Sequence, residues 1–209
     1  MSSDKSSNIF KTLLKKYFID ALGAMALGLF SSLILGLILS QIAKIPGLDF
    51  LTQISDVAKS ETVVGAAIGV AISWGMKSKA MVVFSSAIVG AVGYVAGGPV
   101  GAYLAAGVGS EIGGLIADKT KIDIVLTPLV TTLSGGIIGI LAGPYISAFM
   151  TYLGNLINTM TELNPIPMGI LISITVGLAL TAPISSAAIC ISIGLSGTAA
   201  GAAGVGCCC

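Results

Sequence analysis

The chain has 209 residues, of which 55% are hydrophobic and 9% are charged, and its formal net charge is +1. Soluble domains carry about 25% charged residues, and disordered chains combine low hydrophobicity with high net charge, so the composition excludes both classes. The small net charge also excludes the basic face of a nucleic-acid-binding protein. We therefore expect an all-α fold, a polytopic transmembrane helical bundle with kinked or broken helices.

The residue types that are missing limit the chemistry of the chain. It has no histidine, which excludes a Ser-His-Asp triad, a histidine metal site and a phosphohistidine relay. Its four cysteines form none of the Cys-x-x-Cys pairs that zinc or redox sites use. We expect no catalytic constellation, no metal and no cofactor. The cysteines are Cys190 and the terminal Cys207, Cys208 and Cys209.

Residues 1–18 are predicted to form an amphipathic helix at the cytoplasmic surface of the membrane. From Ile9 onward apolar residues recur at helical spacing, whereas Lys11, Lys15 and Lys16 fall on the opposite face. A helix of this kind lies in the membrane interface, with its lysines near anionic lipid headgroups.

Residues 19–209 are expected to form the transmembrane domain, and Asp20 is interpreted as a helix-start residue. About 20 apolar residues cross the hydrocarbon layer. The last apolar segment is a seventh span, a re-entrant segment or the start of an unfinished element. The chain stops without a polar tail, which leaves open that the domain is incomplete at its C-terminus. The segments predicted to cross or enter the membrane are 21–42, 62–76, 80–98, 100–117, 124–150, 168–193 and 194–206.

The connections between these segments are more polar. Residues 43–61 are predicted to be an external loop with an interfacial turn of helix around 50–57, and residues 152–167 an amphiphilic connection. Trp74 is interpreted as an interface anchor. Because proline kinks or ends a helix, prolines are expected to end the third span (Pro99) and to interrupt the fifth (Pro128, Pro144) and the sixth (Pro183).

The positions of the lysines predict the orientation of the chain. Short cytoplasmic loops carry an excess of Lys and Arg. With the N-terminus in the cytoplasm, only Lys44 and Lys59 lie outside. The cytoplasmic lysines are then Lys5, Lys11, Lys15, Lys16, Lys77, Lys79, Lys119 and Lys121.

Small residues recur at helical spacing and are expected to form packing surfaces, because helices in lipid associate by close backbone approach. A small residue also precedes proline three times, and such breaks persist in a membrane where freed backbone groups are buried or line a wet cavity. A kink that serves packing alone remains the alternative. The glycines are Gly97 and Gly101, Gly109 and Gly113, and Gly135, Gly139 and Gly143, and the steps are Gly98-Pro99, Gly143-Pro144 and Ala182-Pro183.

Glu111 is the first candidate binding residue, because an ionisable group within an apolar run marks a pathway or site. The alternative places it at the cytoplasmic interface, seven residues before Asp118.

Hydroxyl and amide groups beside prolines are the other candidates for substrate binding. Asn164 precedes two prolines that hold the backbone open, although the same residues suit an external turn. Thr181, Ser185 and Ser186 flank Pro183, where their hydroxyls can bind a ligand or bond back to their own helix turn.

Five features in this order carry a family resemblance: the basic amphipathic start, Gly97-Gly98-Pro99, Gly109-Ser110-Glu111, Pro165-Ile166-Pro167, and the run from Thr181 to Ala188. The chain resembles the enzyme IIC-like integral membrane proteins of the bacterial phosphotransferase system, in the subgroup without fused IIA or IIB domains. The resemblance covers most of the chain.

This resemblance implies a multi-pass sugar permease in the bacterial plasma membrane. It also implies a homodimer that takes up a carbohydrate, which a separate IIB protein phosphorylates together with IIA. Better-understood IIC sugar sites often pair a carboxylate with a histidine, and this chain has no histidine. That departure suits an alternative, a membrane sensor or regulator that keeps the fold and does not transport. A third hypothesis is that the protein is a channel or a structural membrane protein.

Overall fold

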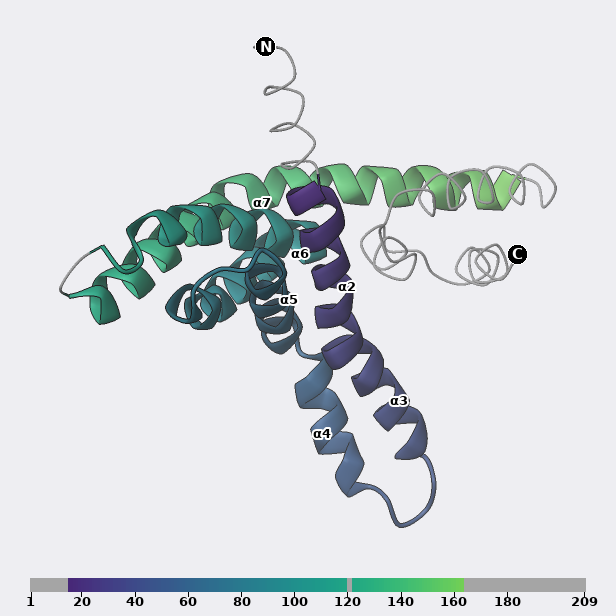
Figure 1. The fold of residues 1–209 in the computed structure, drawn as a ribbon. Coiled ribbons are helices and arrows are strands. Elements are labelled where there is room, and N and C mark those ends of the chain that lie inside the picture. The colour runs from purple at the N-terminus through teal and green to yellow at the C-terminus, as the bar shows by residue number, and fades with distance from the viewer. Residues whose placement is uncertain (1–14, 120–121, 164–209) are drawn as a thin grey trace.

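The computed structural model describes residues 15–119 and 122–163, and every regular element in these ranges is a helix (Figure 1). Three helices there are long and apolar enough to cross a membrane: Lys15–Ile42, Ala80–Ile116 and Asp123–Tyr152. A bent pair, Phe50–Lys59 with Glu61–Gly75, makes a fourth if it is taken as one span. The expected all-α membrane fold is confirmed, and the predicted segments 168–193 and 194–206 lie outside the described residues.

The first span is one continuous helix of 28 residues. At 1.5 Å per residue it is about 42 Å long, which exceeds the roughly 30 Å of hydrocarbon. The prediction that Asp20 starts a helix is wrong, because the helix already runs through Lys15–Ala21. In chain order its parts are the π-helical η1 (Lys15–Ala21), α2 (Leu22–Leu29), the π-helical η2 (Phe30–Ile34) and α3 (Leu35–Ile42).

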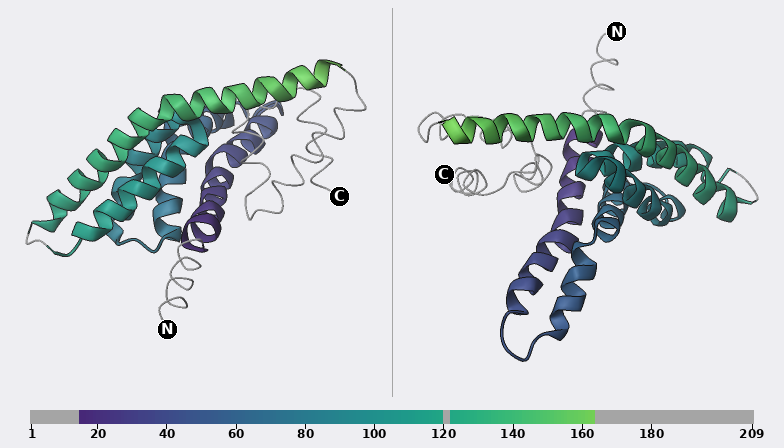
Figure 2. Two further views of the ribbon diagram at one scale, coloured as in Figure 1. Left: turned by 90° about the horizontal axis from the view of Figure 1, so that it is seen from above. Right: turned by 180° about the vertical axis from the view of Figure 1, so that it is seen from behind.

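The helix α4 (Phe50–Lys59) packs beside α3, and the two project from the rest of the molecule as an arm (Figures 1 and 2). The buried Ser55 hydroxyl donates a hydrogen bond of 2.8 Å to the carbonyl oxygen of Gly36. A Cβ on Gly36 would lie 2.7 Å from Cγ of Lys59. The helical turn predicted around 50–57 is therefore confirmed, and it extends to Lys59.

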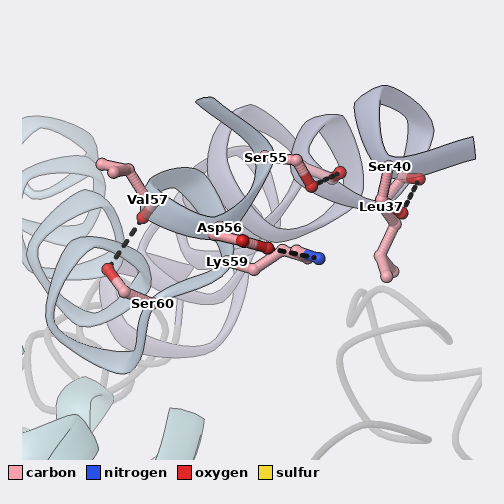
Figure 3. A network of polar contacts seen from close by, with 8 residues as sticks. Leu37, Ser40, Ser55, Asp56, Val57, Lys59 and Ser60 are labelled. Carbon is pink, nitrogen blue, oxygen red and sulfur yellow. Dashed lines mark hydrogen bonds and ion pairs between the residues drawn. The ribbon is translucent and has the colours of Figure 1, made fainter. Parts of the chain in front are cut away.

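Polar contacts at the base of the arm are local to α3 and α4 (Figure 3). Asp56 and Lys59 form an ion pair at 3.3 Å, and the Ser60 hydroxyl donates to the Val57 carbonyl oxygen at 2.7 Å. After a bend of 58° the chain continues into α5 (Glu61–Gly75).

The apolar core lies where α5 packs between the first helix and α6 (Ala80–Ile116). Glycines in this region allow the backbones of neighbouring helices to approach each other closely. A Cβ on Gly28 would lie 2.8 Å from the Ala67 carbonyl oxygen, and one on Gly69 would meet the Gly90 Cα at 2.9 Å. The core residues are Ala21, Met25, Leu29, Val64, Ile68, Ile72, Met76, Ala102 and Ala106.

The helix α6 folds back on itself. Gly97 and Gly98 leave the helical conformation, and Gly98 has φ +64°, which glycine adopts without strain. The two halves then meet along their length: a Cβ on Gly93 would lie 2.7 Å from the Gly101 carbonyl oxygen. At the open end Lys79 Nζ donates to the Ala117 carbonyl oxygen at 2.8 Å. The break predicted at the Gly-Gly-Pro step is confirmed, and it forms a helical hairpin.

The last helix, α7 (Asp123–Leu163), lies against both halves of this hairpin and then runs on past its tip (Figure 2). A Cβ on Gly139 would meet the Gly93 Cα and the Ala105 Cβ at 3.2 Å, and one on Gly143 would meet the Ala96 Cβ at 2.5 Å. The predicted close contact of this glycine face with another helix is confirmed.

The predicted interruptions of α7 are wrong. Pro128 and Pro144 both lie inside one helix that continues to Leu163, through the first part of the expected connection 152–167. Each proline removes one backbone donor. Gly143 differs from Gly98 because it takes no positive φ, so the chain has no turn there.

Candidate functional site

Glu111 lies in the second half of α6, five residues before the helix ends at Ile116. Its carboxylate accepts a hydrogen bond from Lys16 Nζ on η1, which makes an ion pair between residues 95 positions apart. The side chain of Lys16 is 36% exposed and that of Glu111 is 37% exposed. The carboxylate is thus reachable by water and already has a cationic partner.

A hollow of about 500 Å³ opens between η1, the end of α5 and the second half of α6. This volume falls within the usual range of small-molecule sites, which are mostly apolar or aromatic with a few polar groups. Glu111 is its one acidic residue. The residues that line it are Tyr17, Ala21, Met76, Tyr103, Leu104, Gly107, Val108 and Glu111.

Helical spacing explains why α6 contributes so many lining residues. Tyr103, Gly107 and Glu111 follow one another at intervals of four, so they lie on one face of the helix. A Cβ on Gly107 would meet nothing within 4 Å, so the missing side chain at this position leaves space in the middle of the face. A tyrosine and a carboxylate therefore flank an open stretch of helix surface.

A second contact fastens η1 to this face. The Tyr103 hydroxyl donates a hydrogen bond of 2.8 Å to the backbone carbonyl oxygen of Tyr17. The ring of Tyr17 also lines the hollow. Two aromatic rings and one carboxylate thus surround the same space.

The buried hydroxyls nearby serve packing. Ser110 is 2% exposed and its hydroxyl shares a hydrogen bond with Ser73 of α5, on a different face of α6 from Glu111. On α7 the Thr127 hydroxyl donates to Asp123 at 2.5 Å, and the Thr131 hydroxyl donates to the Thr127 carbonyl oxygen at 2.7 Å. These groups satisfy one another inside the protein and do not reach the hollow.

A second hollow, of about 550 Å³, lies along α2 and α5 and is lined by no charged residue. Its lining includes Leu27, Val63, Val70 and Trp74, and Trp74 is 67% exposed. It offers a ligand one hydroxyl, that of Ser31, and suits lipid contact better than recognition of a polar solute.

Of the site residues predicted from the sequence, the structure places Glu111 alone. Asn164, Thr181, Ser185 and Ser186 lie outside the described residues. Sequence reasoning did not find Lys16, Tyr17 or Tyr103 as site residues. Tyr103 could have been found from its spacing to Glu111, whereas only the tertiary fold brings η1 to α6. Within residues 15–119 and 122–163 there is no cluster of His, Cys, Asp and Glu that could hold a metal ion.

Comparison with known proteins gives one match. The model of a family described as "Phosphotransferase system, EIIC" matches residues 19–209. No curated protein and no solved structure matches the chain. The matched range contains Glu111 and the rest of α6, whereas Lys16 and Tyr17 precede it.

Proposed function

Because the chain belongs to the EIIC family of the phosphotransferase system, we propose that it is an integral membrane permease for a small solute, with a carbohydrate as that solute. The family and the apolar helices make it a multi-pass membrane component of phosphotransferase-type transport. The observation that carries the proposal of a carbohydrate is the hollow beside Glu111.

The chemistry of this hollow suits a hydroxylated ligand. A carboxylate accepts charge-assisted hydrogen bonds, which are roughly twice as strong as neutral ones. The residues Tyr17 and Tyr103 also line the hollow, and the apolar faces of tyrosine rings match the apolar parts of a sugar. Asn164, Thr181, Ser185 and Ser186 remain proposed contributors of further hydrogen bonds.

The partners are proposed from the family. A separate IIB protein phosphorylates the solute and receives its phosphoryl group from IIA, because the family belongs to the phosphotransferase system. We place the protein in the bacterial plasma membrane as a homodimer, with its amphipathic N-terminal segment in the cytoplasm.

The test of the site is the substitution Glu111→Gln, which keeps the volume and loses the charge. We expect affinity for the bound carbohydrate to fall about tenfold, equivalent to about 1.4 kcal/mol, while folding is retained. Titration calorimetry of the purified protein with a panel of monosaccharides and disaccharides measures this change. Glu61→Gln, at the exposed start of α5, is the matched control and should bind like the parent. Unchanged affinity in Glu111→Gln would remove Glu111 from the site.

The orientation is tested by thiol labelling of intact cells after the four native cysteines have been replaced. Ser55 is buried, so the exposed Gln53 is the better position on α4. An impermeant reagent should label Gln53→Cys directly, and should label Lys119→Cys only after the membrane is permeabilised, because the lysine distribution places residue 119 inside. The reverse pattern would overturn the orientation.

A membrane sensor is the second candidate, and the absence of histidine favours it. A sensor of this kind binds the solute without moving it. Solute counterflow in proteoliposomes separates the two functions, because a permease exchanges labelled for unlabelled solute across the bilayer and a sensor does not.

A further inference from the structure

We propose that Lys16 competes with the solute for the Glu111 carboxylate, and that η1 (Lys15–Ala21) is an N-terminal strap that restricts access to the hollow until this contact is released. The proposal rests on the proposed function, because it concerns the same hollow and the same carboxylate. It adds regulation by Lys16, which precedes the range matched by the family.

The ion pair occupies part of the acceptor that a solute would use. Lys16 Nζ donates to Glu111 Oε1, so a solute hydroxyl that binds at the same site on this oxygen competes with the ammonium group for the carboxylate. Both side chains are more than one third exposed. Ion pairs with this exposure contribute little net stability, so the contact can be exchanged without unfolding the helix.

The strap packs against the core at Ala21 and Tyr17, whereas several of its other side chains are exposed. Ala21 is 1% exposed and belongs to the apolar core, which anchors the end nearest α2. Ile19 is 49% exposed, and Lys15 and Asp20 are also exposed. Besides the ion pair, a hydrogen bond from the Tyr103 hydroxyl to the Tyr17 carbonyl oxygen joins the strap to α6.

The backbone of the strap is itself unusual. Seven consecutive residues are π-helical, a conformation that is rare and is frequently found at functional sites. Conversion of this segment into an ordinary α-helix would change the position of Lys16 relative to Ala21.

The two possible roles of Lys16, as a structural anchor of the helix and as a competitor of the solute, lead to different experimental results. If Lys16 only anchors the helix, its removal lowers stability and leaves solute affinity unchanged or reduced. If Lys16 competes with the solute, its removal raises affinity and opens the hollow. Lys16→Met is the informative change, and Lys15→Met is a matched control because it removes the same charge one residue earlier from an exposed side chain.

Access to the hollow can be measured without any ligand. In a background that lacks the four native cysteines, Gly107→Cys places a thiol in the hollow, where an added Cβ meets nothing within 4 Å. Loss of an exposed ion pair changes an equilibrium between two conformations by up to about fivefold. We therefore expect a water-soluble maleimide to label this thiol up to about fivefold faster in Lys16→Met. Lys15→Met should label at the parent rate, and Lys16→Arg, which keeps the pair, should do so as well.

Salt weakens the ion pair in the protein that keeps Lys16, and so provides a second measurement. Raising the ionic strength from about 0.01 M to about 1 M screens exposed charges. The labelling rate of the parent Gly107→Cys protein should therefore rise with salt, whereas that of the protein that also carries Lys16→Met should not.

The affinity measurement separates this proposal from the proposed function. We expect Lys16→Met to bind the carbohydrate up to about fivefold more tightly than the parent. Glu111→Gln should bind it more weakly. The thiol of Gly107→Cys should be labelled faster in both variants, because both lose the ion pair.

If the parent binds a carbohydrate and Glu111→Gln weakens this binding, but Lys16→Met changes neither the labelling rate nor the affinity, the proposed strap is wrong and the proposed function stands. Weaker binding in Lys16→Met would make Lys16 part of the site and overturn the competition. If no carbohydrate binds to any variant, the proposed function fails and the competition fails with it.

Discussion

Replacing Gly90 by alanine is expected to destabilise the bundle by about 3 kcal/mol or more, at the upper end of the cost of overpacking a core. A Cβ at this position would lie 2.2 Å from the Gly65 carbonyl oxygen and 2.7 Å from the Gly69 Cα. These neighbours are backbone atoms, which cannot turn aside as a flexible side chain can. The helices α5 and α6 would therefore have to move apart. Thermal unfolding of the purified variant in detergent, with size-exclusion chromatography, measures the loss.

Gly114→Ala is the control for this change. Gly114 lies on the same helix, and a Cβ there would meet nothing within 4 Å. Alanine favours helix over glycine by about 1 kcal/mol, so this variant should be as stable as the parent or slightly more stable. Equal unfolding midpoints for Gly90→Ala and Gly114→Ala would show that α5 and α6 do not pack at the distance described here.

Gly107→Trp is expected to reduce solute affinity by at least about a hundredfold, equivalent to about 2.8 kcal/mol. The indole would occupy the hollow between Tyr17 and Tyr103, the space in which the solute is proposed to bind. The fold should survive, because the added Cβ begins in open space. Titration calorimetry with the same sugars, together with an unfolding curve, gives both quantities.

The matched control for this substitution is Gly114→Trp, seven residues further along α6. Its Cβ is equally unobstructed, but Gly114 does not line the hollow, so we expect unchanged affinity. If both tryptophan variants bind like the parent, the solute site lies elsewhere. If both lose binding to the same extent, the effect comes from the helix and not from the hollow.

Much of the helix pattern could be predicted from the sequence because each signal is local. The helix that begins near residue 61 and ends near Gly75 was visible as an apolar run between charged residues. The break at the Gly-Gly-Pro step could be predicted because proline kinks or ends a helix. The continuity of α7 through Pro144 was not predictable in this way. Proline marks a position where a helix can break, and whether it does depends on packing along the whole helix.

The candidate site was less predictable, because it depends on a contact between distant segments. Glu111 could be found as an acidic residue in an apolar run. Its partner Lys16 could not, since it was interpreted as one of several lysines that face lipid headgroups, and only the tertiary packing of η1 on α6 brings the two together. The space left by Gly107 was also hidden, because glycines at close contacts and glycines that face open space look alike in a sequence.

The contact between α6 and α7 also determines whether one helix could slide along the other. Glycines at four-residue intervals repeat the same smooth surface, so a shift by four residues, about 6 Å, would replace one glycine by the next. Val89 and Thr131 break this equivalence: Val89 Cγ1 lies over Gly135, and Thr131 lies over Gly113. A shift that moves Thr131 into the place of Gly135 would drive it against Val89. The opposite shift brings Gly139 under Val89, but it also moves Ser147 into the place of Gly143, where a Cβ would lie 2.5 Å from the Ala96 Cβ. The interface therefore resists sliding in both directions.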